Sequence, residues 1–203
     1  ASHMLQFNVT DIGAGVNTSS ILVNISNDLY TVDEGNISCS LPLCNGTVTF
    51  AEGVNTYTIS ASDSAQTPNS ETEVYAVTVD TTAPGFDGEP SDQDVNYGSA
   101  FGYQINGTDN IALDSYSVDD TTNFQINESG YLSNNTFLEL GTYQITITVN
   151  DTSGHTNSTT ISVNVSLACG TTVTRNLTMQ GNLDCSGTGN YALHLSGNNI
   201  VLD

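Results

Sequence analysis

Two stretches of eleven residues decide the fold: GVNTYTISASD, from Gly53 to Asp63, and GTYQITITVND, from Gly141 to Asp151. Each begins with glycine, ends with aspartate and alternates apolar with polar side chains in between. Such alternation predicts a β-strand with one buried face, because successive strand side chains point to opposite sides. The copies are offset by 88 residues, so the chain contains two similar modules in tandem.

Each copy is followed by a polar loop and a second alternating strand, EVYAVTVD ending at Asp80 and TTISVNV ending at Val165. A repeat of this length is typical of one immunoglobulin-like β-sandwich. We therefore predict an all-β chain with two tandem Ig-like sandwiches, residues 5–84 and 85–166, joined at Thr81–Pro84. Residues 1–4, Ala-Ser-His-Met, are interpreted as a cloning remnant and are left out of the strand predictions.

The strands expected in the first module follow from short runs of alternating or β-branched residues between turn signals. They are Gln6–Thr10, Ile21–Ser26, Leu29–Val32, Thr47–Phe50, Thr56–Ser62 and Glu73–Val79. In the second module, Tyr143, Ile145, Ile147 and Val149 form one inward row, and Ile161, Val163 and Val165 form another.

The C-terminal segment, residues 167–203, has a different pattern of very short apolar strands separated by tight turns. The expected strands are Thr172–Thr174, Leu177–Met179, Ala192–Leu195 and Ile200–Leu202. Short strands at this spacing favour the opening coils of a parallel β-helix, whose coils need neighbours to bury their apolar face.

The charge balance is extreme: 22 acidic residues stand against one basic residue, Arg175, and the net charge is -21. Such a surface repels nucleic acid and anionic membranes, so neither is an expected partner. It attracts cations, and calcium takes oxygen ligands from carboxylates and carbonyls. The candidate calcium ligands are Asp11, Asp63 and Asp80, expected to converge near the joint, and Asp109, Asp119 and Asp151 in the second module. The alternative is that these aspartates only cap turns through the backbone.

Four cysteines form two close pairs in sequence, Cys39 with Cys44 and Cys169 with Cys185. An even number in an exported chain favours disulfides. Zinc is the alternative, but neither pair has the C-x₂-C spacing or a nearby histidine that zinc sites use.

Asparagine is unusually often followed by the N-x-[ST] pattern, in 12 of its 23 occurrences, where chance predicts roughly six. The glycosylation candidates are Asn8, Asn17, Asn24, Asn36, Asn45, Asn106, Asn127, Asn134, Asn150, Asn157, Asn164 and Asn176. The alternative is that asparagine simply suits turns and exposed strands. Together with the absence of a long apolar run, this pattern predicts an internal part of an extracellular or cell-surface protein.

Several stretches resemble known surface proteins. FNVTDIGAGVNTSSILVNI, GVNTYTISASDSAQ and VTVDTTAP resemble Ig-like repeats of bacterial and archaeal surface proteins, and residues 119–157 look like a cadherin-like or Ig-like repeat. The segment from Cys169 to Asp203 is similar to the first coils of right-handed β-helix surface proteins, including archaeal ones. The resemblance implies a prokaryotic, archaeal cell-surface protein.

Candidates for catalysis are few. The chain has no lysine, and His155 and His194 lie in no recognisable triad spacing, so we expect no enzyme. The first hypothesis is a stalk or adhesin that presents a β-helical domain and attaches to another cell-surface protein or a glycan. The alternative is a pair of accessory modules of a secreted polysaccharide-degrading β-helix enzyme. A weaker option is a glycan-binding module with Tyr97, Tyr116 or Tyr131 as its stacking platform.

Overall fold

The computed structural model describes residues 2–179, 183, 185–186 and 193–197 of the chain. All regular structure in these residues is β-strand, which confirms the predicted all-β class. The chain divides into two compact units, unit 1 (Ala1–Thr81) and unit 2 (Thr82–Asp203). Unit 2 therefore takes in the described part of the C-terminal segment as well as the second module.

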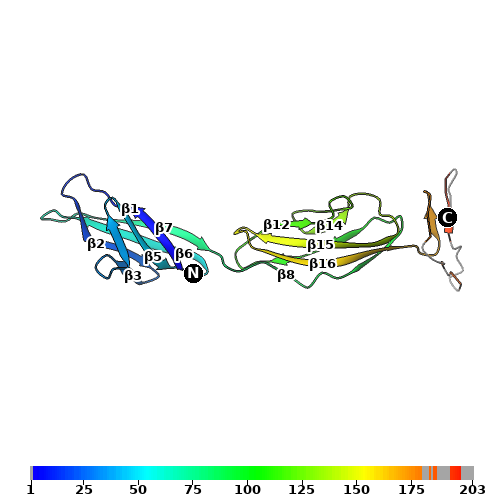
Figure 1. Cartoon of the computed structure of the whole chain (residues 1–203), viewed down its shortest axis with the longest axis horizontal. Coiled ribbons are helices and arrows are strands. Elements are labelled where there is room, and N and C mark those ends of the chain that lie inside the picture. Colours follow the sequence, from blue (N-terminus) through cyan, green and yellow to red (C-terminus); the bar gives the residue numbers. More distant parts are fainter. Residues whose placement is uncertain (1, 180–182, 184, 187–192, 198–203) are drawn as a thin grey trace. The chain divides into compact units, whose positions relative to one another are not determined.

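Unit 1 is a sandwich of two sheets (Figure 1). One sheet has the order β1-β5-β4 and the other the order β3-β2-β6-β7. Strands that are distant in sequence thus lie side by side, as in the Greek-key sandwich of Ig-like domains. The strands are β1 (Ser2–Asn8), β2 (Val16–Ile25), β3 (Asp28–Thr31), β4 (Ile37–Ser40), β5 (Leu43–Thr49), β6 (Gly53–Asp63) and β7 (Ser70–Val79).

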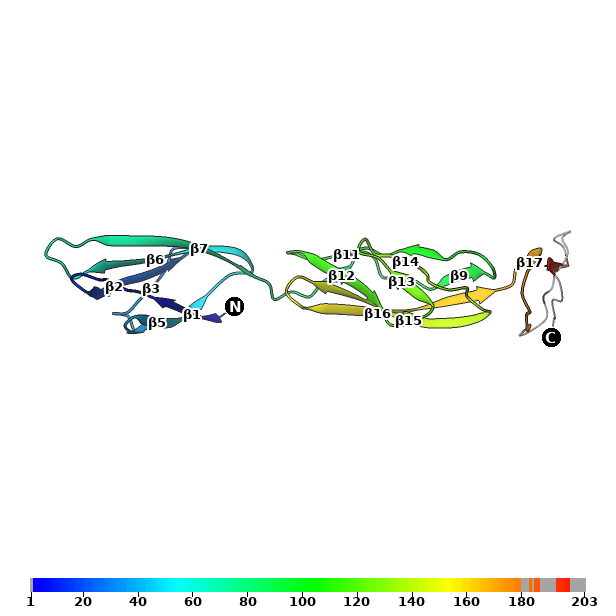
Figure 2. The same cartoon turned by 90° about the horizontal axis from the view of Figure 1, so that it is seen from above.

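Unit 2 has the same plan with additional strands (Figure 2). Its larger sheet has the order β12-β15-β16-β9, and the opposite side consists of β10-β14-β13 and the short pair β11-β8. The strands are β8 (Gly85–Phe86), β9 (Gln93–Asn96), β10 (Gly102–Gln104), β11 (Gly107–Thr108), β12 (Leu113–Val118), β13 (Phe124–Ile126), β14 (Tyr131–Asn134), β15 (Gly141–Asp151) and β16 (Thr156–Ser166).

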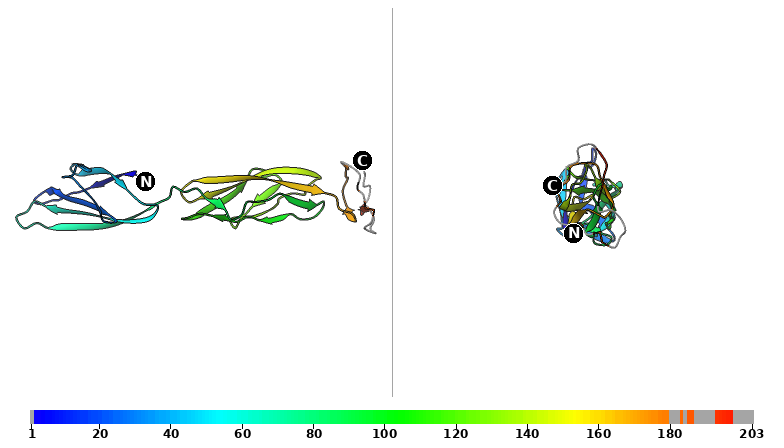
Figure 3. Two further views of the ribbon diagram at one scale, coloured as in Figure 1. Left: turned by 90° about the horizontal axis from the view of Figure 1, so that it is seen from below. Right: turned by 90° about the vertical axis from the view of Figure 1, so that its right-hand side faces the viewer.

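The repeated sequence forms the first strand of a long hairpin in each unit, which can be followed in Figure 3. β6 and β15 begin and end at the glycine and aspartate of the two copies. β6 pairs antiparallel with β7 from Gly53 opposite Val79, and β15 pairs in the same way with β16 from Gly141 opposite Val165. The repeat is therefore one structural element used twice.

The cores lie between the two sheets of each unit, and both are built from alternate strand residues. In unit 1, the fully buried side chains come from β2, β4 and β5: Ile21, Val23, Ile37 and Val48. In unit 2, both predicted inward rows include fully buried residues, among them Ile145, Ile147, Val149 and Val163. Burying such a side chain contributes about 1.5–3 kcal/mol, so these rows fix which face of each strand points inward.

Some strand predictions were wrong in position. β1 runs from Ser2 and pairs with β5 up to Thr49, so three of the four residues excluded as a remnant form part of the sheet. β4, Ile37–Ser40, was missed, because its short alternating run is mostly polar and exposed. In the structure, β4 pairs with β5 in a hairpin, and Ile37 is buried in the core, which the sequence pattern alone does not show.

The C-terminal segment contributes β17 (Thr171–Val173) and β18 (Leu193–Leu195), which pair in parallel. Both fall on strands that the sequence predicts. Val173 and Leu177 are buried in the core cluster of unit 2. The strand expected at residues 200–202 lies outside the described residues, and the β-helix as a whole stays a prediction.

Candidate functional site

The predicted acidic sites of unit 1 do not come together as expected. Asp11 and Asp63 line the same hollow, of about 210 Å³. Asp80, however, follows β7, whose last residue Val79 lies opposite Gly53 at the start of β6. Asp63 ends the same eleven-residue strand, so the length of β6 separates the two aspartates. The expectation that Asp80 joins Asp11 and Asp63 was wrong.

The two aspartates of the hollow hold turns. The Asp11 Oδ2 atom accepts hydrogen bonds from the N–H groups of Gly13, at 2.9 Å, and Gly15, at 2.7 Å. Asp63 accepts from the N–H groups of Ala65 and Asn69 and from the Asn69 side chain. The bonds from Asn69 lower the pKa of Asp63 below its usual value.

The acids of unit 2 are also divided. Asp119 accepts the N–H of Thr146 at 2.8 Å, in the middle of β15, while Asp151 ends that strand five residues later. Asp109 lies close to Asp151, and Ala112 connects the two. The Ala112 N–H donates to the Asp109 side chain, and the Ala112 carbonyl accepts the N–H of Thr152, the residue after Asp151. Asp109 and Asp151 therefore lie at one end of unit 2, and Asp119 does not join them.

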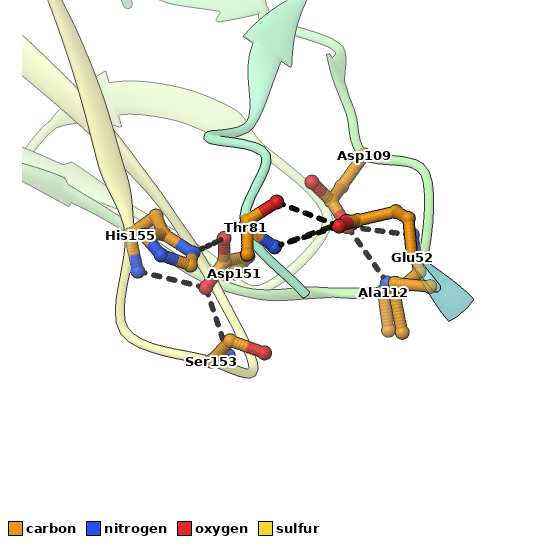
Figure 4. A network of polar contacts seen from close by, with 8 residues as sticks. Glu52, Thr81, Asp109, Ala112, Asp151, Ser153 and His155 are labelled. Carbon is orange, nitrogen blue, oxygen red and sulfur yellow. Dashed lines mark hydrogen bonds and ion pairs between the residues drawn. The ribbon is translucent and has the colours of Figure 1, made fainter. Parts of the chain in front are cut away.

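Asp151 organises the turn between β15 and β16, as Figure 4 shows. Its Oδ1 atom accepts the N–H groups of Ser153 and His155, both at 2.8 Å, and its Oδ2 atom lies 2.9 Å from the His155 Nδ1 atom. Only 3% of Asp151 is exposed. Burial alone would raise its pKa, but the hydrogen bonds from His155 and Ser153 outweigh burial and lower it.

This Asp–His pair resembles two members of a hydrolase triad, but its geometry serves the turn. The main chains of Asp151 and His155 also bond each other, because the Asp151 N–H donates to the His155 carbonyl at 3.1 Å. The side-chain bond of His155 thus adds to a turn that is already closed by hydrogen bonds of its backbone. The same position in unit 1 is filled by Asp63 with Asn69, where no imidazole is present, so turn closure is the shared role.

Asp109 differs from the other candidates. Its Oδ2 atom caps the turn by accepting the N–H groups of Ile111, at 2.7 Å, and Ala112, at 2.9 Å. Its Oδ1 atom is buried without a hydrogen-bond partner. A buried carboxylate oxygen is costly unless something pairs with it, so this atom is an indication of a cation.

Both disulfides form as predicted. Cys39 and Cys44 are directly opposite each other on β4 and β5, and Cys169 is bonded to Cys185 in the C-terminal segment. The part of the chain that the structure describes holds no free cysteine, so the zinc alternative is excluded for these four residues.

None of the candidate glycosylation sites is buried. Eight are exposed, namely Asn8, Asn17, Asn45, Asn106, Asn127, Asn157, Asn164 and Asn176, and the four half-buried ones are Asn24, Asn36, Asn134 and Asn150. Some of them also shape turns: the Asn127 Oδ1 atom accepts the N–H groups of Ser129 and Tyr131. Their surface positions suit glycosylation, and their turn contacts suit the structural alternative.

The aromatic residues considered for glycan stacking differ in exposure. Tyr97 is buried in the core of unit 2, which rules it out as a platform. Tyr116 is half-buried, with its hydroxyl accepting the N–H of Gly107 at 2.7 Å. Only Tyr131, 45% exposed, presents a usable ring among the three.

Two polar residues that were not predicted close the loop before the first strand of the repeated hairpin. The buried Asn55 bonds both the N–H and the carbonyl of Ala51. Tyr143 has the same place in β15, two residues after the glycine, and donates its hydroxyl to the carbonyl of Glu139 at 3.2 Å. Such a tyrosine corner is a feature of Ig-like sandwiches. Their shared spacing from the repeated glycine was the available signal.

Arg175, the single basic residue other than histidine, binds the C-terminal segment to the sandwich of unit 2. Its guanidinium carbon lies 4.6 Å from the centre of the Phe137 ring, and its Nη1 atom lies 3.8 Å from Glu139. Both partners lie in the loop before β15. The contact is exposed, so it contributes on the order of 0.5–1 kcal/mol.

No protein-family model and no curated protein matches the chain. Similar solved structures include mouse cadherin-23 EC22-24, with 20% identity over 83% of this chain and 63% of that chain and a TM-score of 0.35. A chimeric titin Z1Z2-Z1Z2 tandem has 18% identity over 82% of this chain and 91% of that chain, with a TM-score of 0.35. Drosophila N-cadherin EC1-4 has 13% identity over 86% of this chain and 46% of that chain, with a TM-score of 0.38.

Proposed function

We propose that the chain is a non-catalytic, structural and adhesive part of a cell-surface protein, in which two Ig-like units act as a stalk. The observation that carries the proposal is the tandem repetition of one hairpin in two sandwiches, each unit with its own disulfide. Each hairpin has an unbroken antiparallel ladder along an eleven-residue strand. Long ladders that must be broken along their whole length suit a part that carries load.

The C-terminal segment supports the second element of the proposal, presentation of a β-helical domain. β17 and β18 pair in parallel, with Thr171 opposite Leu193, so the chain returns to its starting point after 22 residues. A parallel return over such a distance is what one coil of a β-helix produces. The contacts of Arg175 with Phe137 and Glu139 would then hold the first coil against unit 2.

An extracellular location is part of the same proposal. Disulfides persist in oxidising compartments, and the sequon asparagines lie at or near the surface. No helix of the described residues is long and apolar enough to cross a membrane. With a net charge of -21, the partner we propose is another cell-surface protein or a glycan, without nucleic acid or direct membrane contact.

Bead adhesion tests this function. Beads coated with the chain are passed over cells, protein-coated surfaces and glycan arrays, with beads coated with heat-unfolded chain as the control. Retention only of the folded chain is the expected result. The accessory-module alternative predicts instead retention on polysaccharides, together with release of reducing sugar when the downstream part of the protein is present.

We also propose calcium as the partner of Asp109. A cation would compensate the buried Oδ1 atom, and carboxylate and carbonyl oxygens are its usual ligands. Calcium should then raise the midpoint of thermal unfolding by several degrees, and a chelator should reverse the rise, since a ligand of the folded state alone stabilises it. Asp109→Asn should abolish the effect, and Asp28→Asn on the exposed start of β3 is the control. An equal rise in sodium chloride of matched ionic strength would contradict the proposal.

A further inference from the structure

Unit 2 has a pocket at the end of its sandwich where the C-terminal segment begins. Its volume is about 410 Å³, and small-molecule pockets usually measure ~300–1,000 Å³. β15 and β16 contribute Thr142 and Asn164 to its walls, and the C-terminal segment contributes Met179 and Leu183. The pocket is therefore bordered by the sandwich and by the segment that follows it.

The pocket combines polar and apolar walls. Asp94, Asn164 and Thr142 lie in one row across three strands, because Thr142 pairs with Asn164 and Asn164 pairs with Asp94. Leu167 and Met179 supply apolar surface and also pack against the core cluster of unit 2. Ligand pockets usually combine apolar walls with a few polar groups. A sugar ring, with C–H groups on its faces and hydroxyl groups at its edge, can use both.

The pocket also contains an asparagine that can carry a sugar. Asn164 heads the sequon Asn164-Val165-Ser166, and its asparagine and its serine both line the pocket. All twelve candidate glycosylation asparagines are described, and Asn164 is the one among them that lines this pocket. Asn164 is exposed, so a transferase can reach it. A sugar joined to Asn164 would therefore start at the pocket wall.

Two hydrogen bonds fix how the Asn164 amide is turned. Its Oδ1 atom accepts the Thr142 hydroxyl, and its Nδ2 atom donates to the Asp94 Oδ1 atom at 3.4 Å. An amide nitrogen carries two hydrogens, so Nδ2 can exchange one for a sugar and keep the other for Asp94. Attachment of a sugar is thus compatible with both bonds.

We propose that this pocket holds the first sugar of an N-linked glycan on Asn164, packed between the sandwich and the C-terminal segment. In the attachment step, Nδ2 forms a bond to the anomeric carbon of a lipid-linked oligosaccharide. The bond from that carbon to the donor's phosphate oxygen breaks, and the amide proton leaves with the released lipid phosphate. Asp94 and Ser166 can then bond the sugar's hydroxyl groups, while Met179 and Leu183 pack against its C–H face.

Because N-linked glycans are attached to exported chains, this site presupposes the extracellular location proposed above. The glycan would have a structural role, since it would hold the start of the C-terminal segment against the sandwich. Asn157 is the matched reference, because it is exposed on the same strand and does not line the pocket. Asn45, exposed on β5 of unit 1, is a second reference.

Secretion of the intact chain from a eukaryotic host tests the proposal, with glycans whose first sugar is N-acetylglucosamine. Mass spectrometry of peptides gives the occupancy of Asn164 and of the two reference sites. Peptide N-glycosidase, which cuts between asparagine and the first sugar, is then applied to the folded chain. Release from Asn164 should be at least tenfold slower than from the reference sites, and this difference should disappear after unfolding.

A change in the pocket wall separates the pocket from the sequon. Leu183→Ser keeps the sequon and removes apolar surface, so it should speed release from Asn164 at least fivefold. Leu195→Ser, at a position 50% exposed in the same segment, is the control and should leave release unchanged. Thermal unfolding checks that both variants fold.

The possible failures can be told apart. Equal release from Asn164 and the reference sites, or an empty Asn164 beside occupied reference sites, would overturn the pocket and leave the extracellular location standing. Equal effects of Leu183→Ser and Leu195→Ser would also overturn the pocket. Empty sequons throughout the secreted chain would overturn both the pocket and the glycosylated, extracellular chain that it presupposes.

Discussion

At the scale of single residues, the two units close the same loop with different side chains. The loop that leads into the repeated hairpin is closed by a side chain two residues after the repeated glycine, which is Asn55 in unit 1 and Tyr143 in unit 2. The sequence predicts the strand that follows, because strand periodicity is local. It could not predict the closure, since each bond reaches back to a backbone group whose position depends on the folded loop.

The tyrosine corner gives a first prediction. Tyr143→Phe keeps the half-buried ring packed against the core and removes only the bond to the Glu139 carbonyl, so unit 2 should lose about 1 kcal/mol of unfolding free energy. Urea unfolding measures the loss. Tyr131→Phe, on the exposed surface, is the matched control and should change stability by less than about 0.5 kcal/mol. Equal effects of the two variants would contradict a structural role for the Tyr143 hydroxyl.

The turn aspartates predict how stability depends on pH. The pKa values of Asp63, Asp119 and Asp151 are lowered in the folded chain, while unfolded aspartate titrates near about 3.9. A carboxyl group whose pKa is lower in the folded chain than in the unfolded chain stabilises the fold. This stabilisation is fully present above the unfolded-state pKa and is lost as the pH falls through the folded-state pKa. The unfolding free energy should therefore be level above about pH 5 and decline below about pH 4.

Urea unfolding from pH 2 to pH 7 checks this dependence. Asp151→Asn retains a hydrogen-bond acceptor but loses the charge, so its decline in acid should be shallower than that of the unchanged chain. Asp28→Asn is the control on the exposed start of β3. A decline of the same steepness in Asp151→Asn would show that this carboxylate does not contribute.

At the scale of elements, the strands with strong alternation could be predicted and the strands held by long-range contacts could not. β6 and β15 were predicted because apolar and polar residues alternate over their length. β9 and the segment before it were not predicted, because residues 89–93, EPSDQ, show no alternation of apolar and polar side chains. Its place follows from Asp92 and Glu89 binding β16, some 70 residues further along the chain.

The glycine that begins each hairpin gives an element-scale prediction. Gly53 has φ of 96° and Gly141 has φ of 142°, in the region that side chains disfavour, although neither has an atom within 4 Å of an added Cβ. Gly53→Ala should therefore cost about 1–2 kcal/mol through backbone strain alone. Chemical unfolding measures this cost. Gly13→Ala, where φ is not positive and the Cβ has room, should be nearly neutral, and equal costs would contradict the account.

The predicted acidic sites illustrate the limit of reasoning from residue type. Aspartate is favoured both by calcium and by turns, and composition cannot separate the two uses. The structure distinguishes the two uses. The register of β6 and β7 places Asp63 and Asp80 at opposite ends of one hairpin, and backbone N–H groups bind the carboxylates of Asp63, Asp119 and Asp151. In Asp109, the Oδ1 atom is not used by the turn that its Oδ2 atom caps.

At the scale of the whole molecule, we propose that the chain is a tandem of two sandwiches that unfold separately and carry load. Each has its own core cluster and its own copy of the repeated hairpin. Two such units should fail one at a time when force is applied to the ends, because the contacts that hold each sandwich lie within it.

Single-molecule pulling from both ends tests this claim most directly. We expect two separate force peaks, each releasing roughly 25 nm of chain for the roughly 80 residues of one sandwich, from β1 to β7 in unit 1 and from β8 to β16 in unit 2. Val23→Ala, which leaves a cavity in the core of unit 1, should lower one peak and leave the other unchanged. A single cooperative event, or extension without force peaks, would contradict the stalk.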